Sequence, residues 1–345
     1  MPINRIEIKD FLVFRDEFTM DFCPGINIII GTNATGKTTL LKAMYESVSL
    51  ENYFYTEGAR DEPAYVQSNG IPKYITFIGS TFAQNRHYVC LASFQDKIIL
   101  LEFIDKLTEN QSDKYVKIIT SDALTRGEFV YIPEKDVLTN SSGILALNKK
   151  YGMIPFDQTF IDMITNVGLP VSKDVSAQSQ KILDLISKVI NGQTSYENGE
   201  YYILKNDGQK VAFATEASGY RKFGTLWKLI RNGLLESGAL LFWDEPENSL
   251  NPELMPVLID ILLELQRNGV QIFLATHNHI LARYFDLKRT KDDAVMFHNL
   301  SNDGKQILCN SMDDYTKLKP SVLETADEAL FKAVVAKTMG INGSD

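Results

Sequence analysis

The sequence contains only three cysteines, and their spacing fits no disulfide or metal pattern. Cys23, Cys90 and Cys309 are scattered over the 345 residues. Disulfide frameworks use an even number of cysteines, and zinc sites use closely spaced pairs, so neither is expected. No apolar run approaches the roughly 18 residues that a membrane helix needs, and the first residues do not form a signal peptide. We therefore expect a cytoplasmic protein without a membrane segment.

Basic side chains are also in short supply. The chain has 35 Lys and Arg residues against 44 Asp and Glu, for a net charge of −9. This balance argues against a broad basic surface for nucleic acid, although one local basic groove remains compatible with it. Neither an internal repeat nor a long heptad run is present. With 44% hydrophobic residues, the chain can bury a large core in two domains or one elaborated domain.

A phosphate-binding loop stands near the start of the chain. Residues 31–38 follow the pattern G-x-x-x-x-G-K-[ST], the Walker A motif. The apolar, β-branched run 26–30 predicts a buried strand before it, and 39–45 has helical character after it. Glycines permit a loop whose N–H groups converge on an anion, at the start of a helix that favours negative charge. The expected nucleotide contacts are Asn33, Ala34, Thr35, Gly36, Lys37, Thr38 and Thr39.

Two side chains of this loop have specific expected roles. Lys37 should reach the β- and γ-phosphates of ATP, and the Thr38 hydroxyl should bind Mg²⁺. The alternative is a glycine turn with a solvated lysine, which the flanking strand and helix disfavour. Arg15 lies beside the loop in sequence and is a candidate contact to the nucleotide, whereas the nearby aromatic residues are mostly core candidates.

A second apolar strand ends in two acids. Residues 239–246 read Ala-Leu-Leu-Phe-Trp-Asp-Glu-Pro, the form of a Walker B motif. Open α/β sheets place their ligand crevice at the carboxyl ends of the strands, which is where these acids stand. Asp244 is expected to hold Mg²⁺, and Glu245 to position and deprotonate the attacking water. Two acids that merely end a strand at a turn are the alternative.

From Asp244 to Pro252 the chain resembles the Walker B motif and D-loop of ABC-type ATPases. The likeness is greatest to the RecF, SMC and OLD-like branch, whose members are often called AAA family ATPases, although Asn251 stands where many relatives have aspartate. This resemblance implies an α/β P-loop NTPase with a mixed, largely parallel core sheet, an N-terminal antiparallel sheet and an inserted helical lobe. It also implies ATP and Mg²⁺ as ligands.

Two further motifs extend the resemblance. His277 follows the strand 270–276 and resembles the switch histidine that contacts the γ-phosphate, so it joins Glu245 and Lys37 as an expected catalytic residue. The segment 216–222 resembles the signature loop L-S-G-G-Q. Ser218 and Gly219 match it, while tyrosine and Arg221 replace the second glycine and the glutamine.

The signature loop of relatives binds the nucleotide of the opposite subunit. The resemblance therefore implies contacts from Ser218, Gly219 and Arg221, and a homodimer with two composite ATP sites. Gln84 is the candidate Q-loop glutamine, with contacts to nucleotide and Mg²⁺, and Gln67 is the alternative.

The remaining patterns predict the order of the elements. Strands over 3–8, 11–22 and 26–30 should form a first sheet, and 51–70 a surface excursion. Antiparallel strands should follow over 74–79, 87–94, 97–103 and 115–119, then a strand over 129–132, a helical region over 143–191 and a hairpin over 201–213. The two halves of the ATPase domain are predicted over 1–135 and 201–300. The helical lobe is predicted over 136–200 and a helical tail over 301–345.

The segments that accompany the ATPase domain, here called the head, suggest its role. Transport is disfavoured because no membrane segment is present and about 180 residues separate Lys37 from Ser218. The favoured hypothesis is the ATPase subunit of a prokaryotic anti-phage defence or genome-maintenance module, which senses a cue and controls a separate effector protein. The alternatives are a RecF-like DNA-binding repair ATPase and a nucleotide-bound scaffold with negligible turnover, the latter suggested by the altered signature and D-loop.

Overall fold

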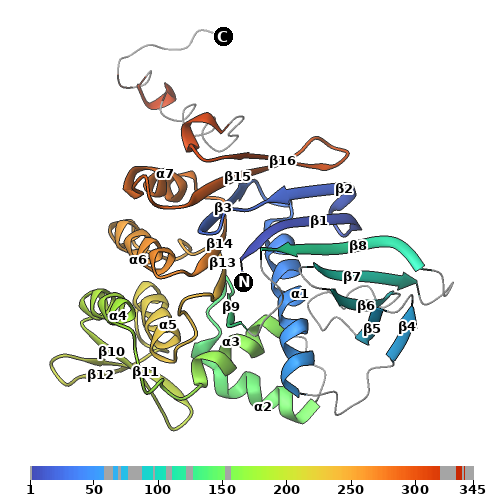
Figure 1. Cartoon of the computed structure of the whole chain (residues 1–345). Coiled ribbons are helices and arrows are strands. Elements are labelled where there is room, and N and C mark those ends of the chain that lie inside the picture. The colour runs from blue at the N-terminus through green and yellow to red at the C-terminus, as the bar shows by residue number, and fades with distance from the viewer. Residues whose placement is uncertain are drawn as a thin grey trace.

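The architecture comes from a computed structural model (Figure 1) and comprises two large sheets with helices between and around them. It describes residues 2–57, 65–68, 71–76, 88–95, 98–105, 111–121, 127–151, 157–318, 332–335 and 338. In these residues the strands form a six-stranded core sheet, a seven-stranded sheet and a small three-stranded sheet.

The core sheet has the order β16-β15-β3-β14-β13-β9 and is parallel except for β16. Every residue of β3, β9, β13 and β14 is buried, as expected for parallel strands that are covered on both faces. Its strands are β3 (Ile26–Gly31), β9 (Phe129–Ile132), β13 (Leu240–Asp244), β14 (Gln271–Thr276), β15 (Val295–Asn302) and β16 (Ile307–Met312).

The seven-stranded sheet is antiparallel throughout, in the order β2-β1-β8-β7-β6-β5-β4. Its β5 to β8 portion corresponds to the predicted meander, whereas β4 lies in the segment that was predicted as a surface excursion. The strands are β1 (Ile3–Phe11), β2 (Phe14–Asp21), β4 (Tyr65–Ser68), β5 (Ile71–Thr76), β6 (Tyr88–Gln95), β7 (Ile98–Asp105) and β8 (Gln111–Thr120).

The prediction that β3 shares a sheet with β1 and β2 is wrong. β3 pairs with β14 and β15, whereas β1 pairs with β2 and β8. Local order along the chain suggested a meander, but β3 is apolar on both faces and β1 alternates, so they suit different sheets. The prediction of a surface excursion from residue 51 is also wrong at its start, because α1 (Lys37–Glu57) continues through that segment.

Helices cover the core sheet. They are α2 (Ser141–Tyr151), α3 (Gln158–Gly168), α4 (Ala177–Ile190), α5 (Ser218–Arg231), α6 (Met255–Arg267) and α7 (His279–Lys288), with short 3-10 turns at η1 (Leu138–Asn140), η2 (Pro252–Leu254) and η3 (Tyr315–Lys317). In Figure 1, α4 to α7 lie on one side of the core sheet and α1 lies between the two large sheets. Leu40, Leu41 and Met44 of α1 share a buried cluster with residues of both sheets.

The segment predicted as a helical lobe is helical in α2 to α4 and packs into the main core. Val167 of α3 and Ile186 of α4 belong to the buried cluster that also holds Leu241 of β13. Asn191 ends α4 in the left-handed conformation, at φ 49°, which is typical of a residue that ends a helix. The chain then forms β10 (Gly192–Glu197), a strand that the sequence analysis missed, which pairs with β11 (Glu200–Lys205); β12 (Lys210–Ala212) completes this small sheet.

The predicted helical tail is partly a strand. β16 pairs antiparallel with β15 and extends the core sheet. In the later part of the predicted tail, residues 332–335 and 338 are described, and they are helical. In the described ranges, no helix has the length and apolar character to cross a bilayer.

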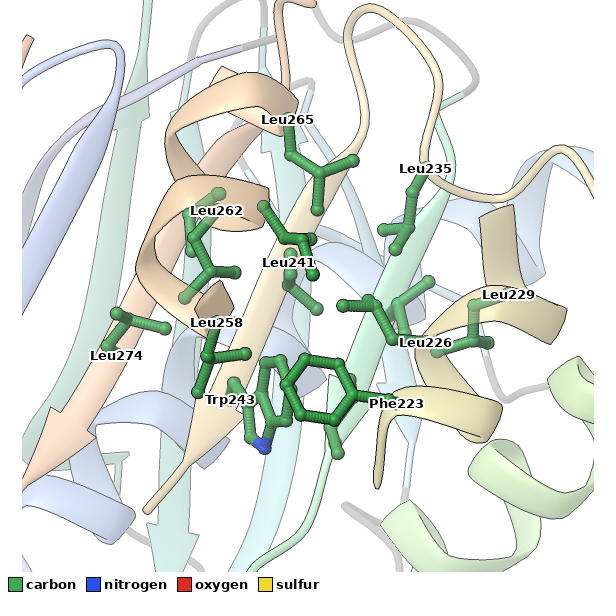
Figure 2. Close-up of a cluster of buried hydrophobic side chains, with 14 of the residues drawn as sticks. Phe223, Leu226, Leu229, Leu235, Leu241, Trp243, Leu258, Leu262, Leu265 and Leu274 are labelled. Atoms are coloured by element: carbon green, nitrogen blue, oxygen red, sulfur yellow. The ribbon is translucent and has the colours of Figure 1, made fainter. Parts of the chain in front are cut away.

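Large side chains fill the layer between the core sheet and the helices α5 and α6. Trp243 and Leu241 of β13 lie in the same buried cluster as Phe223 of α5 and Leu262 of α6 (Figure 2). Both helices carry apolar residues at helical spacing, so each buries one face against the same strands. The start of α5 is consequently fixed with respect to the carboxyl end of β13.

A buried glutamine links the two large sheets. Gln271, the first residue of β14, accepts a hydrogen bond from the Ile3 N–H of β1 at 2.7 Å. Its amide nitrogen donates to the carbonyls of Ile3 at 2.9 Å and Cys23 at 2.8 Å. Gln271 is 2% exposed, so these backbone groups have no water to replace it.

Replacing Gln271 with leucine should therefore destabilise the fold. Gln271→Leu leaves buried backbone groups unpaired, and we expect the free energy of unfolding to fall by about 2–4 kcal/mol in a urea titration. Gln193→Leu, at an exposed position of β10, should change it by less than about 0.5 kcal/mol. Equal losses in the two variants would contradict the bridging role.

Candidate nucleotide-binding site

The phosphate-binding loop connects the end of β3 to the start of α1, the context that the motif requires. Ala34 and Gly36 have positive φ angles of 64° and 87°. A Cβ at Gly36 would lie 2.7 Å from Cγ2 of Val13, so both the backbone angle and the space demand glycine there. The Thr35 hydroxyl donates to the Thr32 carbonyl at 2.9 Å and closes the loop.

Lys37 points back into this loop. Its ammonium group donates to the carbonyls of Gly31 at 2.9 Å and Thr32 at 3.0 Å. The residue is 7% exposed, and this burial lowers its pKa, while the carboxylates of Glu245 and Asp244 oppose the shift. The ammonium is thus held inside the loop, near the acids at the end of β13.

Asp244, the last residue of β13, faces the first turn of α1. Its Oδ2 accepts a hydrogen bond of 2.8 Å from the Thr38 hydroxyl. Its Oδ1 is buried without a hydrogen-bond partner. Burial raises the pKa of Asp244 to about 6, the nearby Glu245 adds to the rise, and the bond from Thr38 opposes it.

The Asp244 and Thr38 pair fits Mg²⁺. The ion prefers oxygen ligands and is usually held by one or two protein groups together with phosphates and water. An orphaned carboxylate oxygen beside a hydroxyl at a phosphate-binding loop supplies that kind of donor set. Among the described side chains, no group of three or more His, Cys, Asp or Glu forms a preassembled metal site.

Glu245 and His277 meet at the edge of the site. The Glu245 Oε1 lies 2.7 Å from the His277 Nδ1, and since an ionised carboxylate only accepts, that nitrogen carries the proton. The His277 side chain is 51% exposed and that of Glu245 17%. Glu245 has a φ of 47°, a conformation that costs a residue with a side chain free energy and that recurs at functional sites.

The signature segment lies against the D-loop of the same chain. The Ser218 hydroxyl donates to the Ser249 carbonyl at 3.1 Å, and Gly219 is buried next to Leu250. Arg221 is bound within its own chain: it pairs with Asp136 at 2.5 Å and donates to the Glu216 carbonyl at 2.6 Å. The structure therefore does not join Arg221 to the phosphate-binding loop, and its contact with nucleotide stays a prediction.

A cavity of about 260 Å³ adjoins the phosphate-binding loop. The turn between β1 and β2, the loop itself and the turn between β15 and β16 enclose it. Arg15 and Ala34, both predicted as nucleotide contacts, lie in its wall together with Lys305. The complete lining is Leu12, Val13, Arg15, Ala34, Asn302, Gly304, Lys305 and Gln306.

For the other predicted contacts, the structure shows only their exposure or does not describe them. Asn33 and Ala34 are exposed on the loop, and Thr39 is half-buried in the first turn of α1. Gln84 lies outside the described residues, and of Gln67 only the backbone, in β4, is described.

Two groups of residues at this site were missed in the sequence. Lys222, in the first turns of α5, donates to the carbonyls of Glu245 at 3.2 Å and Pro246 at 3.1 Å. Burial lowers the pKa of Lys222 to about 8, while Glu247 opposes the shift. Glu247 and Thr276 form the second group, a buried hydrogen bond between the D-loop and the end of β14. Only the position of Glu247 after the Walker B acids could have signalled it.

Two family models match adjoining parts of the chain. Residues 1–142 match the family described as "AAA ATPase domain", and residues 137–282 match "AAA domain, putative AbiEii toxin, Type IV TA system". Together with the fold, these matches make the chain similar to P-loop ATPases of the ABC and SMC type.

Individual relatives agree at low identity. An ATP/GTP phosphatase of Helicobacter pylori is 20% identical over 348 residues, which cover 85% of this chain and 90% of the relative. The DNA replication and repair protein RecF of Lactobacillus gasseri is 51% identical over 45 residues, 13% of this chain and only 12% of RecF.

Solved structures share the fold. An Smc head bound to the C-terminal winged-helix domain of ScpA has a TM-score of 0.51 and 12% identity, over 90% of this chain and 98% of the head. The Smc head with an extended coiled coil, bound to the C-terminal domain of ScpA from Pyrococcus furiosus, has the same TM-score and identity, over 96% and 99%.

The strained position Ala34 provides a test of the loop geometry. The left-handed conformation costs a non-glycine residue about 1–2 kcal/mol, and glycine removes this cost. Glycine also has more freedom in the unfolded chain, which lowers stability by about 0.4–1 kcal/mol. Ala34→Gly should thus raise the free energy of unfolding by up to about 1 kcal/mol in urea titrations. Ala146→Gly, at an exposed position inside α2, should lower it by about 1 kcal/mol. Equal destabilisation of both variants would exclude the strained geometry at Ala34.

Proposed function

We propose that the chain hydrolyses ATP at this site. The observation that carries the proposal is the convergence of Lys37, the Thr38 and Asp244 pair, and the Glu245 and His277 pair at adjoining strand ends. Loop N–H groups and Lys37 bind the β- and γ-phosphates. Thr38 and Asp244 would hold Mg²⁺, which would neutralise phosphate charge there.

The hydrolytic step needs a base next to the γ-phosphate. Glu245 accepts the proton of the attacking water, and its carboxylate is oriented by the hydrogen bond to His277 at 2.7 Å. His277 is half-exposed, so its other ring nitrogen is free to contact the γ-phosphate. The unusual backbone at Glu245 and its N–H bond to the Ala275 carbonyl at 2.9 Å fix the direction of the side chain.

The cavity beside the loop suits the remainder of the nucleotide. Leu12 and Val13 are 50% and 39% exposed and offer an apolar wall for a flat ring. Arg15 and Lys305 add positive charge beside the phosphates. From this wall Arg15 would contact the nucleotide, which stays a prediction.

Two copies of the chain complete two sites. Ser218 and Gly219 begin α5, whose N-terminus has no side-chain cap and favours a phosphate of the partner's nucleotide. Because closure depends on the γ-phosphate, dimerisation follows the hydrolytic cycle and acts as a switch. The relative bound to ScpA supports the idea that such a head grips a further protein.

The switch controls a separate effector in a defence or genome-maintenance module. The description of the matching family as a toxin of a type IV TA system supports the defence role. A RecF-like DNA-binding repair role is the second candidate, favoured by the short stretch of 51% identity to RecF and opposed by the net charge of −9. A nucleotide-bound scaffold with negligible turnover would also have these motifs. A measurement of ATP turnover distinguishes it from the hydrolysing switch.

Complementation between two inactive variants tests hydrolysis and composite sites together. Lys37→Ala removes the phosphate contact, and Ser218→Arg blocks the signature loop, so each alone should show no phosphate release above background. An equal mixture forms mixed dimers with one intact site, and random pairing predicts about a quarter of wild-type turnover per chain.

Lys188, an exposed lysine of α4, offers a matched control. Lys188→Ala should keep wild-type turnover. A mixture of Lys188→Ala and Ser218→Arg should show no more turnover than its Lys188→Ala chains would show alone. A mixture of Lys37→Ala and Ser218→Arg that stays inactive, with active wild type, would exclude composite sites. Inactive wild type would favour the scaffold.

A further inference from the structure

A buried acid, Glu247, lies in the D-loop two residues after Glu245. Glu247 is 7% exposed, and its Oε1 accepts a hydrogen bond from the Thr276 hydroxyl. Its Oε2 is buried without a hydrogen-bond partner. A buried carboxyl group with one unpaired oxygen is destabilising, so its presence calls for a reason other than stability.

Thr276 joins this acid to the turn that carries His277. It is the last residue of β14 and is fully buried. Its oxygen accepts a hydrogen bond of 2.8 Å from the Asn278 N–H while its O–H donates to Glu247. The hydroxyl therefore closes the turn from 276 to 278 and fixes that turn to the D-loop at the same time.

The same two segments also carry the catalytic pair. Glu245 precedes Glu247 by two residues, and His277 directly follows Thr276. The two segments are thus connected twice, by an exposed bond between Glu245 and His277 and by a buried bond between Glu247 and Thr276. The buried bond is protected from water, so it sets the distance at which the exposed pair meets.

We propose that Glu247 and Thr276 are positioning residues for ATP hydrolysis, which hold Glu245 and His277 in register. The proposal rests on the proposed function of that pair. The D-loop further binds the signature helix through the Ser249 carbonyl and Ser218, so a change at the signature reaches Glu245 through the segment that Glu247 anchors.

Isosteric variants test the proposal. Thr276→Val keeps the shape and removes the hydroxyl, and Glu247→Leu removes the acceptor. Each should lower kcat by about tenfold or more and change KM for ATP by less than about threefold, because a small misplacement of catalytic groups affects the chemical step more than binding. The double variant should be no slower than the slower single variant, since both lose one bond.

Conservative variants and a matched control separate positioning from folding. Thr276→Ser keeps the hydroxyl and Glu247→Gln keeps an acceptor oxygen, so both should retain kcat within about threefold of wild type. Thr194→Val removes another buried threonine hydroxyl, which donates to the Gly224 carbonyl at 2.8 Å, and should lower stability without a change in kcat. Equal kcat in Thr276→Val and wild type would overturn the proposal, as would an equal loss of kcat in Thr194→Val.

A measurement without nucleotide separates this proposal from the proposed function. The ring nitrogen resonances of His277, one of four histidines, report its bond to Glu245 in ¹⁵N NMR. Thr276→Val should shift them and Thr194→Val should not. If the wild type hydrolyses no ATP but the shift occurs, only the function fails; if it hydrolyses ATP and the resonances stay in place, the positioning role fails.

Discussion

The register of three neighbouring parallel strands determines the site. β14 lies between β3 and β13, with Thr276 opposite Ile30 and Ala275 opposite Asp244. Because their carboxyl ends meet at one edge, the phosphate-binding loop, the two acids and His277 arrive side by side. The buried side chains of these strands fix that register, since a shift by one residue would turn core residues toward the opposite face.

Charge adds a second constraint. Asp244, Glu245 and Glu247 lie close together, and Lys37, Lys42 and Lys222 are among the nearby cations that oppose them. Under the proposed function, a nucleotide would bring further negative charge to these carboxylates, which a divalent ion held by Asp244 and Thr38 would offset. Lys222 binds the backbone carbonyls behind Glu245, so the signature helix and the acidic strand end behave as one unit.

Much of this arrangement was predictable from sequence. Continuous apolar runs predicted β3, β13 and β14, and the motifs at their ends predicted Lys37, Thr38 and Asp244 as neighbours. The sheet to which β3 belongs was not predictable from local order, because strand pairing depends on which residues lie opposite one another across the fold. β10, β15 and β16 are short or mixed in pattern, and their pairing was missed for the same reason.

The side-chain contacts around the site were harder to predict. Arg221 binds Asp136 and two carbonyls of its own chain, contacts that the sequence did not predict, and its contact with a nucleotide stays a prediction. The bonds of Lys222 and of Glu247 with Thr276 join segments distant in sequence and follow no motif. Such partners depend on tertiary packing, which the order of residues in one chain does not display.

The mass in solution tests the central claim most directly. Light scattering should be measured for wild type, Glu245→Gln and Lys37→Ala, each with and without Mg-ATP. The account predicts that Glu245→Gln, which binds ATP but lacks the base, changes from 38.9 kDa to twice that mass only with Mg-ATP, and that Lys37→Ala does not change. If Glu245→Gln has the same mass with and without Mg-ATP, this result would contradict the account of an ATP-driven head.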